Sequence, residues 1–333
     1  MGMRMKLSDL GERRIIDKII KMLRKCPQAL LPLGDDAAAY ELMDDLVLLI
    51  HTDMLVWKTD VPPAMSPYQV GRKLAVMNYS DIAAKGGKPV GILVSFALPS
   101  NTDMNTLLEI MRGIEDYSKS VGAYVLGGDL NESNEIIVSG TSIGLARKNE
   151  VISRFSAKPG DFVAVTGYFG RTGAGLKILL EGISVDESIK EPLVKSVLEP
   201  NARIKEGIAL AKSGAVSASI DSSDGLAESL YELSAASDVG FIIFEEKLPI
   251  PREVVEFSKI TKTDPLEYVF YGGEEYELVL TVRKGMWEIA EREVRSIGGS
   301  LFQIGHVIEE RKILLKRRDG SIEEIKRKGY QHF

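Results

Sequence analysis

The chain has 333 residues, of which 44% are hydrophobic and 27% are charged, as in an ordinary folded globular protein. This length exceeds that of most single domains, so we expect two domains. A formal net charge of −6 argues against a nucleic-acid partner, whose backbone needs clustered cations. The single cysteine, Cys26, excludes an internal disulfide and a metal site built from cysteines, and three histidines are too few for a His-rich zinc centre.

The first 23 residues lack the uninterrupted apolar segment of a secretory signal. Ser8 is instead the predicted N-cap of an amphipathic helix, whose apolar face carries Ile15, Ile16, Ile19, Ile20 and Leu23. The longest apolar runs, 46–50 and 90–98, are too short to cross a bilayer. We therefore expect a cytoplasmic protein with no membrane partner.

Acidic residues follow a turn predicted at Gly34 and a strand predicted in the next segment. In LPLGDDAAAY, Gly34 predicts a turn and is followed by Asp35 and Asp36, although a plain turn explains this pair equally well. The apolar run LVLLIHTD predicts a buried strand that ends in Thr52 and Asp53. A proline-broken loop that contains Asp60 comes next.

Asp81 lies within NYSDIAAKGGKP, among small residues that would let a large ligand come close. Apolar spacing predicts a helix from about residue 71 to Lys85, and two glycines and a proline end it. A single helical aspartate is more often a solvated surface residue. A functional role for Asp81 therefore depends on the other acids.

A third acid follows the strand predicted in AYVLGGDL, where Gly127 and Gly128 precede Asp129. Glycines at a strand end allow the backbone to approach a phosphate, although Gly-Gly-Asp is also a common turn. We place the domain boundary near Glu150, which divides the chain into residues 1–150 and 151–333.

The second half opens with a strand, a glycine-rich turn and a helix over residues 161–182, but its glycines fit neither common phosphate-binding motif. A later predicted strand ends in Asp221, Ser222, Ser223 and Asp224 before a helix. Helix capping explains one of these residues but not two acids and two serines. The tail predicts a hairpin about Asp319 and Gly320.

These acids share one setting, the end of a strand or the start of a helix beside small residues: Asp35, Asp36, Asp53, Asp81, Asp129, Asp221 and Asp224. Carboxylates that converge in a cleft repel one another by several kcal/mol per pair, and divalent cations remove this repulsion. Donors that are all oxygen favour Mg²⁺, which completes its shell with water and substrate phosphates. The pattern therefore predicts ATP-dependent phosphoryl transfer without a protein nucleophile, with Arg154 reaching a phosphate.

The motifs GDDAA, TDM, NYSDIAAKGGKP, GGD, SRFSAKPGD, DSSDG, GGEEYEL and KGYQHF, in this order, resemble the thiamine-monophosphate kinase family. That family belongs to the superfamily of aminoimidazole ribonucleotide synthetase and selenophosphate synthetase. The resemblance implies an α+β fold in two domains, with an N-terminal α/β domain that forms a homodimer through its sheet and a C-terminal α+β domain that completes the site. It also implies several Mg²⁺ ions and transfer of the ATP γ-phosphate to thiamine monophosphate.

The same resemblance assigns roles by position. The implied metal ligands are Asp36, Thr52, Asp53, Asp81, Asp129 and Asp221, with Asp35 beside them and Asp224 as a further candidate. The implied nucleotide-binding positions are Gly128, Asp129, Arg154 and Ser223. Glu274 and Tyr330 match positions that contact thiamine, and an aromatic ring suits a cationic thiazolium.

Two positions depart from the family pattern. His51 stands where many relatives have serine, a harmless change if the backbone carbonyl is the ligand there. Asp60 stands where relatives commonly have histidine, and an acid there could attract the thiazolium. The identity of the acceptor is therefore the least determined part of the hypothesis.

Four other functions are alternatives to this hypothesis. Cys26 lacks the glycine-rich loop of a selenophosphate synthetase, and the chain ends in GYQHF rather than in the reactive cysteine of a hydrogenase-maturation relative. An aminoimidazole ribonucleotide synthetase would release free phosphate, so its products distinguish it. A nucleotide-binding module without turnover is disfavoured because every acid is retained.

Overall fold

The computed structural model describes residues 6–328, so the predicted thiamine contact Tyr330 lies outside the described residues. The helices are α1 (Glu12–Ile20), α2 (Trp57–Asp60), α3 (Pro67–Ala84), α4 (Met104–Ser120), α5 (Arg171–Glu181), α6 (Glu187–Leu198), α7 (Ile204–Ser213), α8 (Leu226–Ser237), α9 (Arg252–Thr261), α10 (Pro265–Tyr271) and α11 (Trp287–Ser296), with 3-10 turns at Leu7–Asp9, Lys148–Glu150 and Glu245–Lys247. The strands are β1 (Ala38–Glu41), β2 (Leu46–Val56), β3 (Lys88–Leu98), β4 (Tyr124–Glu132), β5 (Ile137–Arg147), β6 (Phe162–Val165), β7 (Val216–Asp221), β8 (Gly240–Phe244), β9 (Leu278–Val282), β10 (Phe302–Ile308), β11 (Ile313–Lys316) and β12 (Ile322–Glu324). Helices and sheets are mixed in both halves, as expected for an α+β protein.

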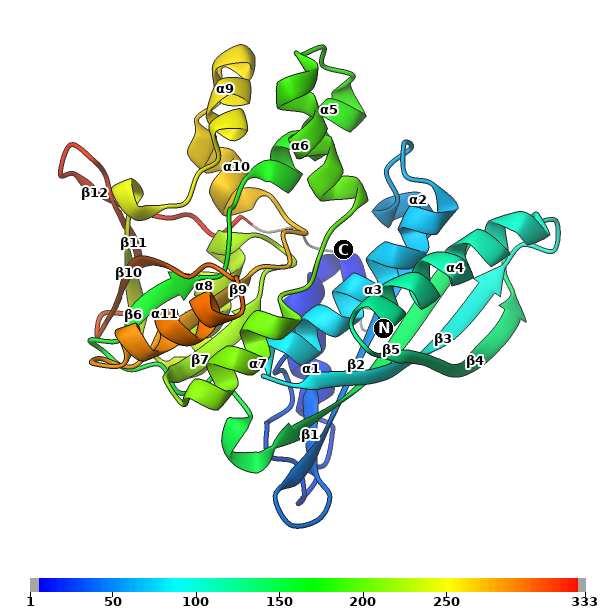
Figure 1. The fold of residues 1–333 in the computed structure, drawn as a ribbon, viewed down its shortest axis with the longest axis horizontal. Coiled ribbons are helices and arrows are strands. Elements are labelled where there is room, and N and C mark those ends of the chain that lie inside the picture. The colour runs from blue at the N-terminus through cyan, green and yellow to red at the C-terminus, as the bar shows by residue number, and fades with distance from the viewer. Residues whose placement is uncertain (1–5, 329–333) are drawn as a thin grey trace, which may run out of the picture.

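The first half contains a five-stranded sheet in the order β1-β2-β5-β3-β4. Only β3 and β4 run parallel; the other neighbouring strands are antiparallel. α3 and α4 cover one face of this sheet (Figure 1). α3 begins at the capping box of Ser66 and Gln69 and ends at Lys85 before two glycines, so the predicted Asp81 helix is confirmed.

The opposite face of the sheet is open. Side chains alternate along β2 and β5, with one set buried beneath α3 and the other set exposed or half-buried. Large apolar side chains lie on this open face, including Met54, which is 56% exposed, and Leu93, which is 40% exposed. A sheet face of this kind is an unusual surface for a monomer, because contiguous exposed apolar area favours association.

The second half contains a seven-stranded sheet in the order β12-β11-β8-β10-β6-β9-β7. Its largest buried cluster includes Phe169, Leu230 and Phe241, from the loop before α5, from α8 and from β8. β11 and β12 pair antiparallel around residues 317–321, which confirms the predicted hairpin at Asp319 and Gly320. The boundary expected at Glu150 falls between the two sheets and remains a prediction.

The two halves meet along α3, which packs on α7 and on β7. Gly207 of α7 lies so close to α3 that a Cβ there would be 2.2 Å from the carbonyl oxygen of Ala83, which explains why a glycine is needed. Tyr276 belongs to the second half by sequence but is buried in the apolar core of the first. This packing places Asp81 of α3 beside Asp221, the last residue of β7.

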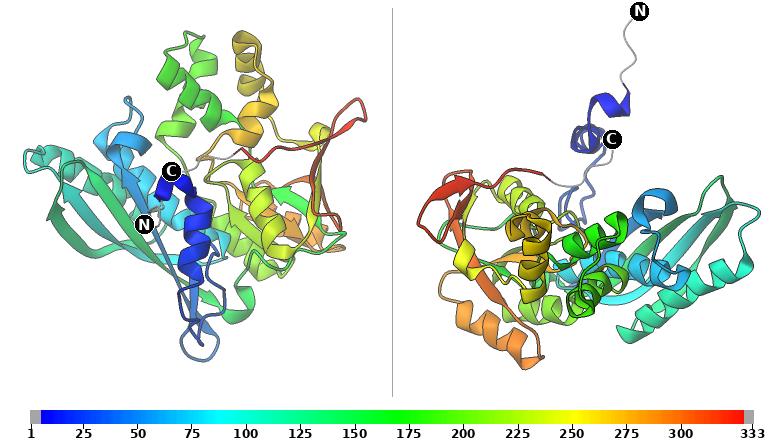
Figure 2. Two further views of the ribbon diagram at one scale, coloured as in Figure 1. Left: turned by 180° about the vertical axis from the view of Figure 1, so that it is seen from behind. Right: turned by 90° about the horizontal axis from the view of Figure 1, so that it is seen from above.

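α1 begins at Glu12 with Gly11 as its N-cap, and Ser8 lies in the preceding 3-10 turn. The prediction that Ser8 caps this helix is therefore wrong. Glycine with φ +74° starts the helix instead, because that backbone geometry disfavours residues with a side chain. None of the residues of α1 is buried, and the helix stands against the back of the junction between the halves (Figure 2).

Within residues 6–328, the helices that are long enough to cross a bilayer are not apolar enough to do so.

Candidate active site

Acids from distant parts of the chain meet where the two halves join. Carboxylate oxygens of Asp36, Asp81 and Asp221 all lie within 4.8 Å of one another, and a ring nitrogen of His51 forms a second such group with Asp53 and Asp81. Asp36 precedes β1, His51 and Asp53 lie in β2, Asp81 lies on α3, and Asp221 ends β7. The structure thus brings together four of the acids that the sequence marked as metal ligands.

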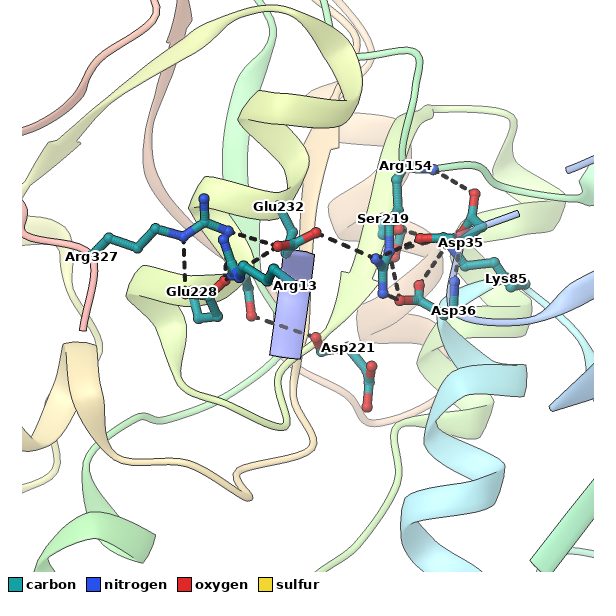
Figure 3. Close-up of polar contacts among 12 residues, drawn as sticks. Arg13, Asp35, Asp36, Lys85, Arg154, Ser219, Asp221, Glu228, Glu232 and Arg327 are labelled. Carbon is teal, nitrogen blue, oxygen red and sulfur yellow. Dashed lines mark hydrogen bonds and ion pairs between the residues drawn. The ribbon is translucent and has the colours of Figure 1, made fainter. Parts of the chain in front are cut away.

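Two of the acids are neutralised by buried cations. Lys85 Nζ lies 2.6 Å from Asp35 Oδ1 and 2.7 Å from Asp36 Oδ2, and it donates a hydrogen bond to the carbonyl oxygen of Ser219. Arg154 binds Asp36 through its guanidinium, and its backbone N–H donates to Asp35 Oδ2 at 3.2 Å (Figure 3). We call Asp35, Asp36, Lys85 and Arg154 the ionic quartet. Burial alone would raise the pKa of Asp36, but the two cations outweigh it and hold this pKa below the usual value.

Asp81 and Asp221 have no such cation beside them. Burial, followed by the charge of Asp36, raises the pKa of Asp221 to about 7, although Ser80 donates a hydrogen bond of 2.7 Å to its Oδ2. Burial and the neighbouring Asp221 and Asp53 raise the pKa of Asp81 well above its usual value. We call Asp53, Asp81 and Asp221 the acid cluster.

Only one basic side chain reaches the acid cluster among the described residues, that of His51. Its Nε2 lies 3.3 Å from Asp53 Oδ2 and 3.2 Å from Asp81 Oδ2. Burial lowers the pKa of His51, but the hydrogen bond with Asp53 and its charge outweigh burial and raise this pKa. An imidazole nitrogen thus lies beside the oxygen donors that the sequence predicted.

The acid cluster suits a divalent cation. Asp81 is only 8% exposed, and its carboxylate accepts no hydrogen bond from the part of the chain that the structure describes. In the described part of the chain, the one ion-pair partner of this carboxylate is Nε2 of His51, so the converging carboxylates share little positive charge and their oxygens fit a bound metal ion. Carboxylate ligands suit Mg²⁺, as the sequence predicts.

A cavity of about 610 Å³ opens beside the acid cluster. Asp81, Asp221, Ser223, Asp224 and Arg154 line its polar side, and the apolar side chains of Ile16, Ile20, Leu33, Phe155 and Ile220 line the rest. A cavity with a polar end and an apolar wall has the chemistry that a nucleotide requires.

Both ends of the described chain contribute to the rim of this cavity. Arg13 of α1 and Arg327 near the C-terminus both pair with Glu228 and Glu232 of α8 (Figure 3). Glu228 is 5% exposed, so these ion pairs are partly shielded from water. The pairs of Arg13 tie α1, which contributes Ile16 and Ile20 to the apolar lining, to α8.

Other predicted residues lie apart from this cluster. Gly128 and Asp129 lie in β4, paired with Val94 and Ser95 of β3, and three strand spacings separate β4 from β2, a distance of about 14 Å. Asp129 also faces the open side of the sheet. Thr52 donates a hydrogen bond to the carbonyl oxygen of Gly140, on the face opposite Asp53.

Two of the predicted acceptor contacts meet at a lysine that the sequence reasoning missed. Lys73 of α3 is 2% exposed; its Nζ lies 2.5 Å from Glu274 Oε1 and donates to the carbonyl oxygen of Asp60 at 2.7 Å. The carboxylate of Asp60 accepts a hydrogen bond from the backbone N–H of Val56. Asp60 thus closes its own turn, whereas Glu274 reaches across from the second half.

The comparisons with known proteins agree with this geometry. Residues 34–146 match the family model for the N-terminal domain of AIR synthase related proteins, and residues 158–316 match the model for the C-terminal domain. The thiamine-monophosphate kinase of Pyrococcus horikoshii is 39% identical over 300 residues, covering 90% of each chain. That of Bacillus subtilis is 33% identical, covering 90% of this chain and 93% of its own.

Solved structures give the same result. The structure of AaThiL complexed with AMPPCP and TMP superposes with a TM-score of 0.87, at 30% identity and with full coverage of both chains. The hydrogenase maturation protein HypE of E. coli, at 21% identity, shares the fold, with a TM-score of 0.71 and coverage of 95% of this chain and 97% of its own. With both domain models matched and close relatives along nearly its whole length, the chain belongs to the AIR synthase related proteins and, among them, to the thiamine-monophosphate kinase family.

Proposed function

We propose that this protein transfers the γ-phosphate of Mg·ATP to thiamine monophosphate, which yields thiamine diphosphate and ADP. A phosphate oxygen of the acceptor forms a bond to the γ-phosphorus while the bond from that phosphorus to the β,γ-bridging oxygen breaks. The observation that carries the proposal is the acid cluster beside a cavity of about 610 Å³, in a chain of this family.

The metal ligands of the proposal are Asp36, Asp53, Asp81 and Asp221, with Asp35 and Asp224 as further candidates. Thr52, which the sequence also marked as a ligand, lies on the opposite face of β2 from Asp53. When held by these carboxylates, Mg²⁺ would neutralise the negative charge of the phosphates during transfer. The protein's own part is to hold the carboxylates close together and to place Arg154 and Ser223 at the wall of the cavity, where they face the nucleotide.

The acceptor side of the proposal includes Glu274, Asp60 and Tyr330. Lys73 supports it, because this buried ammonium holds the loop of Asp60 and the side chain of Glu274 in one arrangement. An anionic Glu274 is well suited to a cationic thiazolium. The charge pattern therefore fits an acceptor with a positive ring and a negative phosphate.

We include a homodimer in the proposal, formed through the open face of the five-stranded sheet. Met54 and Leu93 make that face apolar, and Asp129 lies on it, about 14 Å from β2. If Gly128 and Asp129 act in ATP and metal binding, a second copy is the simplest means of bringing them to an acid cluster. Because ATP is the donor, we place the reaction in the cytoplasm.

The test follows phosphorus by NMR while the purified protein is incubated with Mg·ATP and thiamine monophosphate. We expect thiamine diphosphate and ADP in equal amounts, and only when both substrates and Mg²⁺ are present. A parallel sample contains the linear precursor of aminoimidazole ribonucleotide. Free phosphate in that sample would favour the synthetase reaction, and no turnover in either would contradict the proposed kinase.

A further inference from the structure

His51 has a fixed orientation beside the acid cluster. Its Nδ1 lies 2.5 Å from the backbone carbonyl oxygen of Asp36, an atom that carries no proton. Nδ1 must therefore be the donor, so the ring presents Nε2 to Asp53 and Asp81. In β2, positions 51 and 53 lie on the same face, because side chains alternate along a strand.

The surroundings of Nε2 require a cation. A neutral imidazole would direct the lone pair of Nε2 at two carboxylate oxygens, 3.2 and 3.3 Å away. Either a proton on Nε2 or a metal ion between the three atoms would remove that repulsion. The distances suit the second case, because two ligands at right angles, each about 2.2 Å from one ion, are separated by about 3 Å.

Asp81 provides an independent observation. Its carboxylate is largely buried yet accepts no hydrogen bond within residues 6–328, whereas Asp221 receives one from Ser80. The only positive group paired with the Asp81 carboxylate among these residues is the imidazole of His51, so the carboxylate depends on a proton or a metal ion at Nε2. Its oxygen faces the same point as Nε2 of His51.

The contact at Nδ1 is also the one that metal-binding histidines make. Such histidines donate their second ring N–H to a carbonyl or a carboxylate, which fixes the ring and leaves the other nitrogen as ligand. Here the carbonyl belongs to Asp36, whose side chain forms part of the ionic quartet. The ring is therefore oriented by the backbone of a residue whose side chain is paired with both Lys85 and Arg154.

We propose that Nε2 of His51 coordinates a divalent cation together with Asp53 and Asp81, and that this position binds Mn²⁺ in preference to Mg²⁺. Imidazole nitrogen suits the first-row transition metals, whereas Mg²⁺ favours a shell of oxygen alone. The inference rests on the proposed function in one respect: it takes the acid cluster to be the metal site. It does not depend on the acceptor.

Pulsed electron paramagnetic resonance of bound Mn²⁺ tests the proposal directly. The metal-free protein is mixed with substoichiometric Mn²⁺, and the spin-echo envelope is examined for modulation by ¹⁴N. We expect imidazole modulation in the wild type and in His306→Gln, whose histidine lies in β10, and none in His51→Ser. Competition titrations should show that the preference for Mn²⁺ over Mg²⁺ falls roughly tenfold in His51→Ser.

Bound Mn²⁺ without nitrogen modulation in the wild type would overturn the proposal, since His51 would then be an internal counter-ion. An unchanged preference for Mn²⁺ over Mg²⁺ in His51→Ser would also overturn the proposal. If that variant does not fold, wild-type protein labelled with ¹⁵N-histidine must show the modulation frequencies of ¹⁵N. A protein that fails to phosphorylate thiamine monophosphate would still give the nitrogen signal, so failure of the two proposals can be told apart.

Discussion

The ionic quartet and the acid cluster are neighbours that differ in how the charge of their carboxylates is balanced. In the quartet, Lys85 and Arg154 balance Asp35 and Asp36, and the Lys85 side chain is fully buried. In the acid cluster, Asp53 and Asp81 share the imidazole of His51, and Asp221 accepts a hydrogen bond from the neutral Ser80. The pKa of Asp36 is accordingly lowered, whereas those of Asp81 and Asp221 are raised.

This difference distinguishes charge that the protein balances by itself from charge that it leaves largely unbalanced. The quartet joins the two halves of the chain, because Asp35, Asp36 and Lys85 come from the first half and Arg154 from the second. Its charges are satisfied without a ligand. The acid cluster can be satisfied only by protons or by cations from solution, and this is the property of a metal site.

The largest effect is expected from Lys85→Met. This change leaves Asp35 and Asp36 buried with one cation fewer, and removal of one partner from a buried ion pair costs about 3–5 kcal/mol. Urea unfolding measures this loss of stability. The control is Lys88→Met, because Lys88 is exposed and lies three residues further along the chain; this variant should change the free energy of unfolding by less than about 0.5 kcal/mol. Equal losses in the two variants would show that the quartet is not structural.

Glu275 shows a third arrangement, in which a buried carboxyl group keeps its proton in the folded state. It accepts hydrogen bonds from the backbone N–H groups of Gly170 and Thr172 at the start of α5, yet burial dominates and raises its pKa to about 7. The folded state thus holds a proton that the unfolded state loses near pH 4.5. Its contribution to stability is present below about pH 4.5 and declines as the pH rises through about 7.

We therefore expect the unfolding free energy of the wild type to fall between pH 5 and pH 8, by on the order of 2 kcal/mol from this group after allowance for its partial exposure. Glu275→Gln removes the titrating group and should flatten the profile by this amount. Urea unfolding at several pH values measures both proteins. A variant with the slope of the wild type would show that Glu275 is ionised in the folded state.

Part of the site could be predicted from the sequence, because local signals assign its acids to individual elements. The predicted strand ends at Asp53 and Asp129 are wrong, since β2 continues to Val56 and β4 to Glu132. The apolar run before Thr52 and Asp53 forms β2, and the glycines after Lys85 end α3. Such signals depend on residues a few positions apart. They therefore placed Asp53, Asp81 and Asp221 on the right elements.

The partners of those acids could not be predicted in this way. Lys85 meets Ser219 across 134 residues, and the contact exists only because α3 packs on β7. Lys73, which joins Asp60 to Glu274, was missed for the same reason. The position of His51 beside Asp53 could have been predicted from the sequence, since a strand places residues 51 and 53 on one face.

The smallest change in the free energy of unfolding is expected from Asp81→Asn. It is a gain in stability, whereas Lys85→Met causes a loss. The change removes one negative charge from three carboxylates that, within the described chain, have only the imidazole of His51 as a paired base, so the metal-free protein should become more stable by about 1 kcal/mol at pH 8. With saturating Mg²⁺ the order should reverse, because only the wild type then gains binding energy. Urea unfolding with EDTA and with Mg²⁺ measures both states, and Asp45→Asn, in an exposed ion pair with Arg147, should change neither. A metal-free Asp81→Asn protein that is several kcal/mol less stable than the wild type would place Asp81 with the quartet, as a structural charge, and remove the distinction between the two regions.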